Sequence, residues 1–549
     1  MERLRGRSFF SPIHSKEMVK FPITMVSLFI RAWLRSPAHV ILFSIYPVLA
    51  LFLANIQEID PNVIWRPMVI GIILAVLLYL LSQTFFKNYI KSAILVTLSL
   101  ILFFSYGHVF DLIRSIGGIF LEIGRNRYLI PLWIALWGGS LVFILRKPAG
   151  SLMGLNRYLN LISIILLLLI LAGIIQFSIQ QSSTSRTIEQ FAIEVPKINQ
   201  AAAVKPDIYY IILDSYPRED VLLNENGIDN SEFIRELQEI GFVIPPCSRS
   251  NYNYTLASVA SSLNMNYLDQ LPVPMNTDRT NRLPMRELIY HSRAAQTLSQ
   301  AGYQTVSVEH NYRFMEWEDA DIFFKQPQSI FFDTRFRSFE RILLRTTALR
   351  YLIDAQSDNI NKWNRKNKLD PQLDKYYREL FTFDSIKGIP ANPEPTLFFT
   401  NIDAIHAPLV FGADGSYVGV SDFQDVTLDQ INERINPQLL PGSVEYLNKT
   451  LLELVKGIIR DSSTAPVIIL QGDHAMSNSS RNLIFNAYYL PGNQTQIPAG
   501  ITPVNTFRLI FNSYFDANLP LLSDRAYLSD YGKTPYQFKE TRDKNPVCQ

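Results

Sequence analysis

The sequence predicts an α/β protein in which a bundle of apolar helices precedes a domain with a mostly parallel sheet. Three observations lead to this fold class. Apolar residues make up 48% of the 549-residue chain and are concentrated in its first third. Two later β-forming runs, 208–213 and 467–470, are each followed within three residues by an acidic residue, as expected of buried strands that build a site at one sheet edge. Between these runs, helical and strand patterns alternate.

Five apolar runs in the first third are each close to the ~20 residues that cross a bilayer. An earlier run, 23–33, is short and interrupted by Arg31, so we expect it to lie along the membrane interface. We therefore predict a membrane domain at 1–180 with about five transmembrane helices. The runs are 37–55, 68–86, 92–108, 128–145 and 159–179.

The positive charges predict how this domain is oriented. Lys and Arg gather before the first run, between the second and third, and between the fourth and fifth, and such charges favour the cytoplasmic side. An odd number of spans then places everything after Ile179 on the extracytoplasmic side of the cell (inner or plasma) membrane. The spans contain few charges and no carboxylate relay, which favours an anchor in the lipid bilayer. Presentation of a lipid-linked substrate stays open as a second role.

The chain after the spans divides into a linker and one further domain. Residues 181–205 are rich in Gln, Ser and Thr and indicate a linker that can include a short helix. We expect 206–549 to form an extracytoplasmic domain, with a helix at 231–240 that ends at Gly241, and a helical insertion within 323–387. A net charge of +2 without a basic patch argues against nucleic acid as the main partner.

The two cysteines, Cys247 and Cys548, both follow the last span. An extracytoplasmic location permits a disulfide, and an even number of cysteines is compatible with one. We favour a pairing that ties the C-terminal tail to the region before residue 255, although the sequence does not fix it.

The stretch 250–264, SNYNYTLASVASSLN, changes from a polar loop to a helix of small residues. Thr255 is thereby predicted near a helix N-terminus, where unpaired N–H groups and the helix dipole favour an anion. A Thr at this place can cap the helix, which is its commoner role. It can also be a nucleophile whose anionic substrate lies over the same N–H groups.

Acidic residues and a histidine follow the two buried runs. Asp214 comes after 208–213, and Asp473 and His474 come shortly after 467–470. Carboxylates with one imidazole make an oxygen-rich metal site. Taken singly, Asp214 can cap a turn and the Asp-His pair can be a solvated strand end.

Together, these motifs resemble those of the alkaline phosphatase/sulfatase superfamily. The similarity is to its membrane-anchored branch, which includes lipoteichoic acid synthases and phosphoethanolamine transferases, and it covers about 207–525. It rests on IILDS, YTLASVASSLN and IILQGDHA. The resemblance implies a sulfatase-like α/β/α domain with Thr255 as nucleophile. It also implies a set of metal ligands: Asp214, Thr255, Asp473 and His474.

The same resemblance implies a role for His406, which lies in an H-x-P motif next to the substrate in the family. His406 is expected to bind the anionic substrate or to protonate the leaving group. The sulfatase signature Cys-x-Pro-Ser-Arg is absent, and Thr255 stands in the place of its Cys. Ser215 replaces the second acid of many sulfatases, and Ala475 replaces the usual Gly. We therefore expect one divalent ion (Mn²⁺, Mg²⁺ or Zn²⁺) rather than two.

The expected function is metal-dependent hydrolysis or transfer of phosphodiester or sulfate esters. An unmodified Thr suits phosphoryl transfer, and the anchor suits a membrane-lipid donor and an envelope glycan or other envelope acceptor. The alternatives are a sulfuric ester hydrolase of the same fold and a non-catalytic, membrane-tethered domain that binds glycans or lipids. Arg481, Arg508 and Arg525 are candidates to contact an anionic group, but surface or structural roles are commoner and none is assigned.

Overall fold

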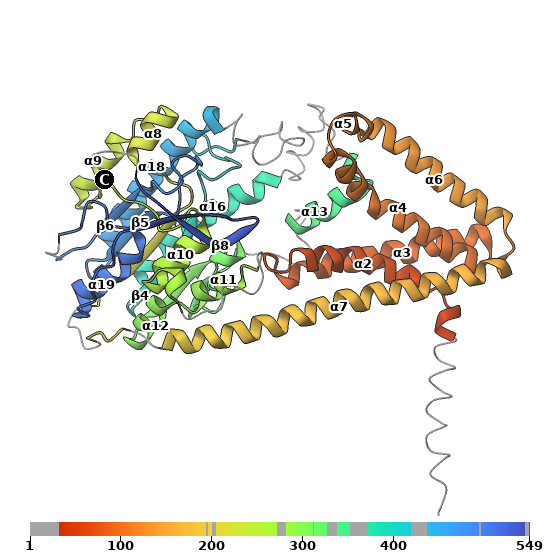
Figure 1. The fold of residues 1–549 in the computed structure, drawn as a ribbon, viewed down its shortest axis with the longest axis horizontal. Coiled ribbons are helices and arrows are strands. Elements are labelled where there is room, and N and C mark those ends of the chain that lie inside the picture. The colour runs from red at the N-terminus through yellow and green to blue at the C-terminus, as the bar shows by residue number, and fades with distance from the viewer. Residues whose placement is uncertain are drawn as a thin grey trace, which may run out of the picture. The chain divides into compact units, whose positions relative to one another are not determined.

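The computed structural model describes residues 32–193, 196–199, 205–271, 281–310, 312–326, 338–351, 371–418, 436–492, 496–543 and 548. They form two compact units (Figure 1). The first unit contains the apolar helices together with a later segment that begins at Phe339. The second contains the α/β domain and the short segment Asn55–Asp60. The basic residues before Arg31, and most of the expected interfacial run, lie outside the described residues.

All five apolar runs form helices. Among the described residues, four helices are long and apolar enough to cross a membrane, and α2, with 16 residues, is shorter. The last helix continues to Ile193, so the first half of the expected linker is helical. The helices of this region are α2 (His39–Ala54), η1 (Pro61–Ile64), α3 (Trp65–Phe86), α4 (Tyr89–Ser115), α5 (Phe120–Ile123), α6 (Asn126–Arg146) and α7 (Ala149–Ile193).

The second unit contains a six-stranded sheet in its described part, with the order β3-β2-β4-β1-β5-β6. Every neighbouring pair is parallel except β5 and β6, so the predicted mostly parallel sheet is confirmed. Strands β1, β4 and β5 are buried along their whole length, which explains their continuous apolar sequences. The strands are β1 (Ile208–Leu213), β2 (Gln304–Val308), β3 (Ile322–Phe324), β4 (Thr396–Ile402), β5 (Val467–Gly472) and β6 (Asn486–Tyr489).

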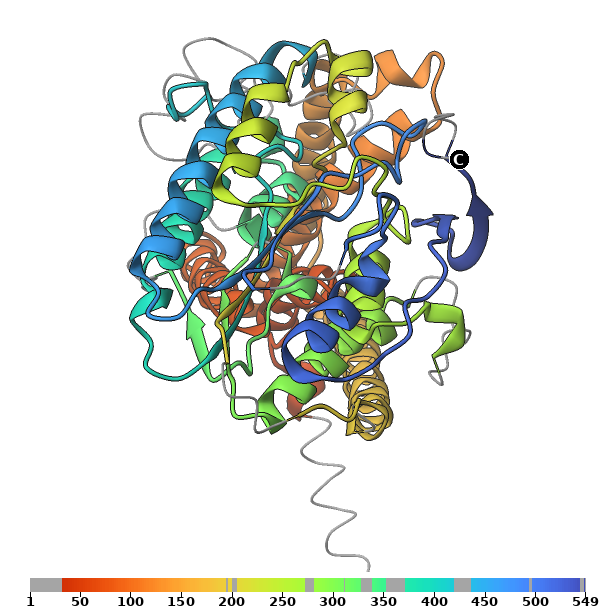
Figure 2. The same ribbon diagram turned by 90° about the vertical axis from the view of Figure 1, so that its left-hand side faces the viewer.

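Helices cover both faces of this sheet (Figure 2). Side chains of β1 alternate between two apolar cores: Tyr210 belongs to one and Tyr209 to the other. The first core is covered by α10 (Thr255–Asn264), α11 (Leu283–Tyr290), α12 (Arg293–Gln300) and α19 (Thr506–Phe515). The second is covered by α8 (Glu219–Asn226), α9 (Ser231–Ile240), α16 (Pro371–Lys387) and α18 (Asn436–Asp461). This is the expected α/β/α arrangement.

The remaining elements are short. Within 323–387, expected as a helical insertion, α13 (Ser338–Thr346) and α16 are helices, and β3 ends at Phe324. Residues 327–337 and 352–370 of that region lie outside the described residues. Cys247 and Cys548 form the disulfide that the sequence favoured. The other elements are η2 (Leu268–Gln270), η3 (Arg313–Met315), η4 (Ile389–Ala391), η5 (Pro503–Asn505) and the hairpin of β7 (Ala526–Asp530) and β8 (Thr534–Thr541).

Candidate metal and nucleophile site

Three acidic residues lie side by side at the carboxyl edge of the sheet because of strand register. Leu213, the last residue of β1, pairs with Ile402 of β4 and with Gly472 of β5. The next residue of each strand is an aspartate: Asp214, Asp403 and Asp473. Parallel strands thus bring together carboxylates that are far apart in sequence.

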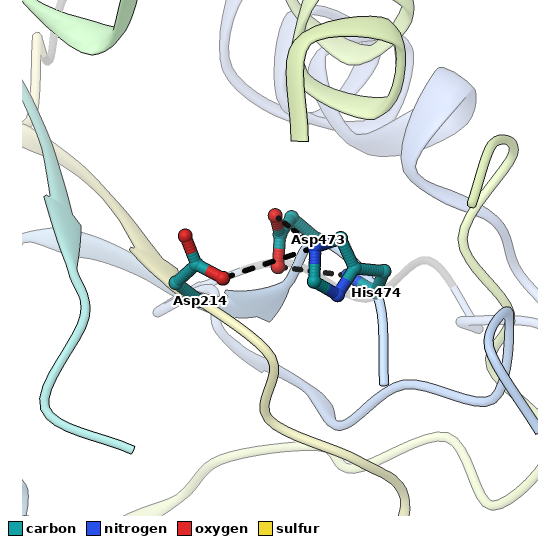
Figure 3. A group of neighbouring side chains, drawn as sticks. All are labelled: Asp214, Asp473 and His474. Atoms are coloured by element: carbon teal, nitrogen blue, oxygen red, sulfur yellow. Dashed lines mark hydrogen bonds and ion pairs between the residues drawn. The ribbon is translucent and has the colours of Figure 1, made fainter. Parts of the chain in front are cut away.

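Asp214, Asp473 and His474 form a buried cluster at this edge (Figure 3), with one potential ligand atom of each lying within 4.8 Å of the others. His474 Nε2 is 3.6 Å from Asp473 Oδ2 and 3.9 Å from Asp214 Oδ1. The hydroxyl oxygen of Thr255 is 3.4 Å from the same nitrogen. Three separate segments therefore bring together the four residues predicted as metal ligands, whose roles stay predictions.

Thr255 is the first residue of α10, as the change from polar loop to small residues predicted. The capping position is occupied by Tyr254, whose backbone is extended and whose side chain makes no capping hydrogen bond. The Thr255 hydroxyl is therefore available to the cluster rather than used as the helix cap. All ten residues of α10 are buried, which its small side chains permit against the sheet.

The backbone around the cluster holds Asp473 in place. Asp473 Oδ1 accepts hydrogen bonds from the backbone N–H groups of Ser215 (3.0 Å) and His474 (2.8 Å). Ser215 has a left-handed conformation with φ of 65°, which is uncommon for a residue with a side chain. Gly472 allows the close approach of this turn, because a Cβ there would lie 2.4 Å from the carbonyl oxygen of Tyr216.

His474 has the hydrogen bond that a metal-binding histidine needs. Its Nδ1 is 3.1 Å from the carbonyl oxygen of Ala475, so Nδ1 donates its proton there and Nε2 carries the lone pair, which accepts from Arg481 Nη2 at 3.2 Å. Burial, helped by the nearby Arg481 cation, lowers the pKa of His474 to about 3. The imidazole is therefore neutral at physiological pH and presents a ligand atom to the cluster.

The cluster fits a divalent cation. Asp473 Oδ2 is buried and has no hydrogen-bond partner among the described residues. Burial also raises the pKa of this carboxyl group, as expected of a carboxylate removed from water. Two carboxylates, an imidazole and a hydroxyl suit Mn²⁺, Mg²⁺ or Zn²⁺. Such an ion would be held by Asp214, Asp473, His474 and Thr255.

Arg481 also reaches the cluster, although nothing in the sequence distinguishes it from the two other candidate arginines. Its Nη2 is 3.2 Å from His474 Nε2. Its other nitrogens donate to the carbonyl oxygens of Asn253 (3.0 Å) and Met476 (3.1 Å). The guanidinium is thus fixed beside His474, whereas Arg508 donates to the carbonyl of Met265 at the end of α10.

A second cluster, of His310, Glu379 and Asp403, lies at the same edge. Here His310 Nδ1 accepts a hydrogen bond from the backbone N–H of Tyr312 (3.0 Å). The proton of the neutral imidazole must then be on Nε2, which faces Asp403 at 4.0 Å and has no lone pair to offer a metal. Lys375 supplies the positive charge, with Nζ 3.0 Å from Asp403 Oδ1.

Lys375 also holds the loop that carries His406. Its Nζ donates to the carbonyl oxygens of His406 (2.6 Å) and Pro408 (3.2 Å). The Lys375 ammonium thereby fixes the backbone on both sides of Ala407. Sequence reasoning found His406 but missed Lys375, His310 and Asp403. Asp403 had a detectable signal, because it directly follows a predicted strand and precedes His406 by three residues.

No family model and no curated protein matches the sequence. Solved structures similar to the chain include the C-terminal periplasmic domain of EcEptC from Escherichia coli, with 10% identity, a TM-score of 0.37 and coverage of 64% of this chain and 97% of that chain. The lipooligosaccharide phosphoethanolamine transferase A of Neisseria meningitidis has 10% identity and a TM-score of 0.32, and the match covers 88% of this chain and 96% of that chain. The lipoteichoic acid synthase LtaP of Listeria monocytogenes has 13% identity and a TM-score of 0.34, and the match covers 62% of this chain and 83% of that chain.

Proposed function

We propose that this protein is a membrane-anchored, metal-dependent enzyme that transfers a phospho-group from a membrane lipid to a cell-envelope acceptor through a Thr255 ester. The observation that carries the proposal is the Thr255 hydroxyl, at the start of α10, 3.4 Å from the imidazole of a buried Asp–Asp–His cluster. A hydroxyl next to a divalent-ion site is a typical activated nucleophile.

The proposed domain layout is a membrane domain at 1–180, a connecting segment at 181–205 and a catalytic domain at 206–549. The catalytic domain faces the extracytoplasmic side. The Cys247–Cys548 disulfide supports this location, because disulfides persist in oxidising compartments. The four long apolar helices support the membrane anchor.

In the first chemical step the Thr255 hydroxyl gives up its proton to water, Oγ1 forms a bond to the phosphorus, and the bond between the phosphorus and the leaving alcohol oxygen breaks. When bound, the cation lowers the pKa of the Thr255 hydroxyl and neutralises charge on the phosphoryl oxygens. The N-terminal N–H groups of α10 favour the same negative charge. Arg481, fixed by Asn253 and Met476, is placed to bind a phosphoryl oxygen.

The leaving oxygen takes a proton from His406 in this proposal. In the second step, the hydroxyl of the acceptor attacks the phosphorus, the bond to Thr255 Oγ1 breaks, and Oγ1 takes a proton back from water. His406 takes the proton of the attacking hydroxyl, which restores its first state. Water in place of the acceptor would give a hydrolase with the same residues.

The test is metal-dependent cleavage of bis(p-nitrophenyl) phosphate by the full-length protein in detergent. Replacing Thr255→Ala removes the nucleophile and is expected to lower kcat by about a thousandfold or more. Thr297→Ala is the matched control, because Thr297 is also buried but lies on α12 and donates to the carbonyl oxygen of Arg293. Undiminished metal-dependent cleavage by the Thr255→Ala variant would refute the assignment.

A further inference from the structure

An apolar cavity of about 580 Å³ lies within the first unit, between α3, α4 and α6. Leu74 and Leu78 of α3 form one wall, and side chains of α6 from Ile130 to Trp137 form the other. Phe103 and Tyr106 of α4 lie between them. Several rim side chains, including Leu74 (45% exposed) and Ile134 (64%), are open to the surroundings of the bundle. The cavity is therefore accessible from the side that would face lipid.

The polar groups that the helices bring to this cavity are bound within the protein. Trp133 Nε1 donates to the carbonyl of Leu102 (2.8 Å), and Trp137 Nε1 donates to the Ser99 hydroxyl (2.9 Å). The Tyr106 hydroxyl donates to Asn126. Because these groups are already paired, the helical walls offer a ligand mainly apolar surface. A hydrocarbon chain fits such walls, whereas a sugar or a phosphate would lose its hydrogen bonds to water.

One end of the cavity is closed by Ala348 and Tyr351, which come from the segment after α13 rather than from the apolar helices. This segment packs directly on α4: the N–H of Ala348 donates to the carbonyl of Phe103 (2.8 Å). A Cβ at Gly107 would lie 2.1 Å from the carbonyl oxygen of Arg345, so the contact requires glycine.

Ion pairs fix the same segment. Arg350 pairs with Asp111 of α4 at 2.8 Å, and Glu340 of α13 pairs with Arg66 of α3. The part of the chain between β3 and β4 thus supplies Ala348 and Tyr351 to the lining of a cavity among the apolar helices. This connection distinguishes the cavity from the general lipid-facing surface of the bundle.

We propose that this cavity binds one acyl chain of the lipid donor. The identification of the lipid as donor rests on the proposed function, whereas the binding of a chain rests on the cavity alone. Leu74→Trp is designed to fill the cavity from its rim. Leu77→Trp is the matched control, because Leu77 lies on the same helix, is 58% exposed and does not line the cavity. Ile134→Trp fills the cavity from the opposite wall, should Leu74→Trp not fold.

The first measurement is lipid retention by the full-length protein, with dioleoyl phosphatidylethanolamine and dioleoyl phosphatidylglycerol as probes and native mass spectrometry as readout. Wild type and Leu77→Trp are expected to retain one lipid. Leu74→Trp is expected to bind the lipid with an affinity lower by about tenfold or more. Exclusion of only two methylene groups corresponds to roughly tenfold in affinity. Equal retention by the two Trp variants would overturn the proposal.

The second measurement separates binding of the lipid chain from the catalytic reaction. Leu74→Trp is expected to raise KM for the dioleoyl donor about tenfold and to leave cleavage of bis(p-nitrophenyl) phosphate unchanged. An unchanged KM for the dioleoyl donor, with lipid still retained, would also contradict the proposal. If wild type cleaves neither substrate, the proposed function fails, and lipid retention by the variants still decides whether the cavity binds a chain.

Discussion

The two histidine–carboxylate clusters at the carboxyl edge of the sheet have similar residues but opposite hydrogen bonds. His474 Nδ1 lies against a carbonyl oxygen, which leaves the lone pair of the neutral ring on Nε2. His310 Nδ1 lies against a backbone N–H, which places the proton on Nε2. The comparison teaches that grouped acids and a histidine do not define a metal site, because the partner of the second ring nitrogen decides which tautomer is present.

The two clusters also differ in how far the chain itself neutralises their negative charge. In the second cluster, Lys375 lies against Asp403. Burial alone would raise the pKa of the Asp403 carboxyl group. The positive charge of Lys375, with smaller contributions from His310 and His406, outweighs burial and lowers this pKa below its usual value. Burial, together with the Asp403 charge, raises the pKa of Glu379 well above its usual value, so Glu379 keeps its proton. This cluster is thus neutralised by the chain itself. The first cluster has Arg481 beside it but also keeps an unpaired buried oxygen on Asp473 among the described residues.

The largest expected effect comes from removing one carboxylate of each cluster in turn. Asp473→Asn is expected to lower metal-dependent kcat by about a thousandfold, because a proposed ligand loses its charge. Asp403→Asn leaves the first cluster intact. It is expected to lower kcat only about ten- to a hundredfold, because Asp403 pairs with Lys375, which holds the loop of His406. Steady-state kinetics with bis(p-nitrophenyl) phosphate measures both. Equal losses would break the distinction between the clusters.

A smaller effect is expected from Lys375→Met, which removes the ammonium that holds the His406 loop. We expect a loss of about tenfold on a substrate with an alkyl leaving group, which needs a proton, and little loss on a p-nitrophenyl ester. Lys387→Met is the control, since Lys387 lies on the same helix but pairs with Asp384 at the surface.

If Lys375 acts through His406, its loss adds nothing to the effect of His406→Ala. The double variant is therefore expected to match His406→Ala alone, as a double-mutant cycle would show. Additive losses would mean that Lys375 contributes only to general stability, and the positioning role would then be wrong.

The smallest effect concerns stability near the second cluster. Burial raises the pKa of Glu316, which accepts a hydrogen bond from the N–H of His310, from 4.5 to about 7. Between these values the folded protein binds a proton that the unfolded chain releases, so this contribution to stability falls as the pH rises from 4.5 to 7. Its full change is about 3 kcal/mol.

Glu316→Gln removes this titration and keeps an acceptor oxygen. The free energy of unfolding of the variant relative to wild type is therefore expected to increase between pH 4.5 and 7 and to stay level above pH 7. Thermal unfolding in detergent across this pH range measures the difference. A constant difference between the two proteins would show that Glu316 does not titrate as described.

Much of the fold was predictable from local signals. Long apolar runs gave the helices of the first unit, and continuous β-forming runs gave the central strands, because both patterns follow directly from burial. Asp214, Asp473 and His474 were predicted as site residues because they follow the predicted strands. Thr255 was found through the change from polar loop to small-residue helix.

The rest depends on contacts that no local pattern encodes. Lys375 lies on α16, inside a region without a regular sequence pattern, and becomes informative only when it meets the loop of His406. Arg481 resembles Arg508 in sequence context, yet one lies beside the cluster and the other at the end of a helix. The tautomers of His310 and His474 are set by single backbone groups. The closing wall at Ala348 could not be expected from its neighbouring residues.

The number of metal ions bound per chain tests the central claim most directly. Elemental analysis of the full-length protein, purified with Mn²⁺, Mg²⁺ or Zn²⁺ supplied, is expected to find one ion in wild type and one in His310→Gln. The same measurement is expected to find none in His474→Gln. Two ions in wild type, loss of the ion from His310→Gln, or its retention by His474→Gln would contradict the assignment of the metal site to Asp214, Asp473, His474 and Thr255.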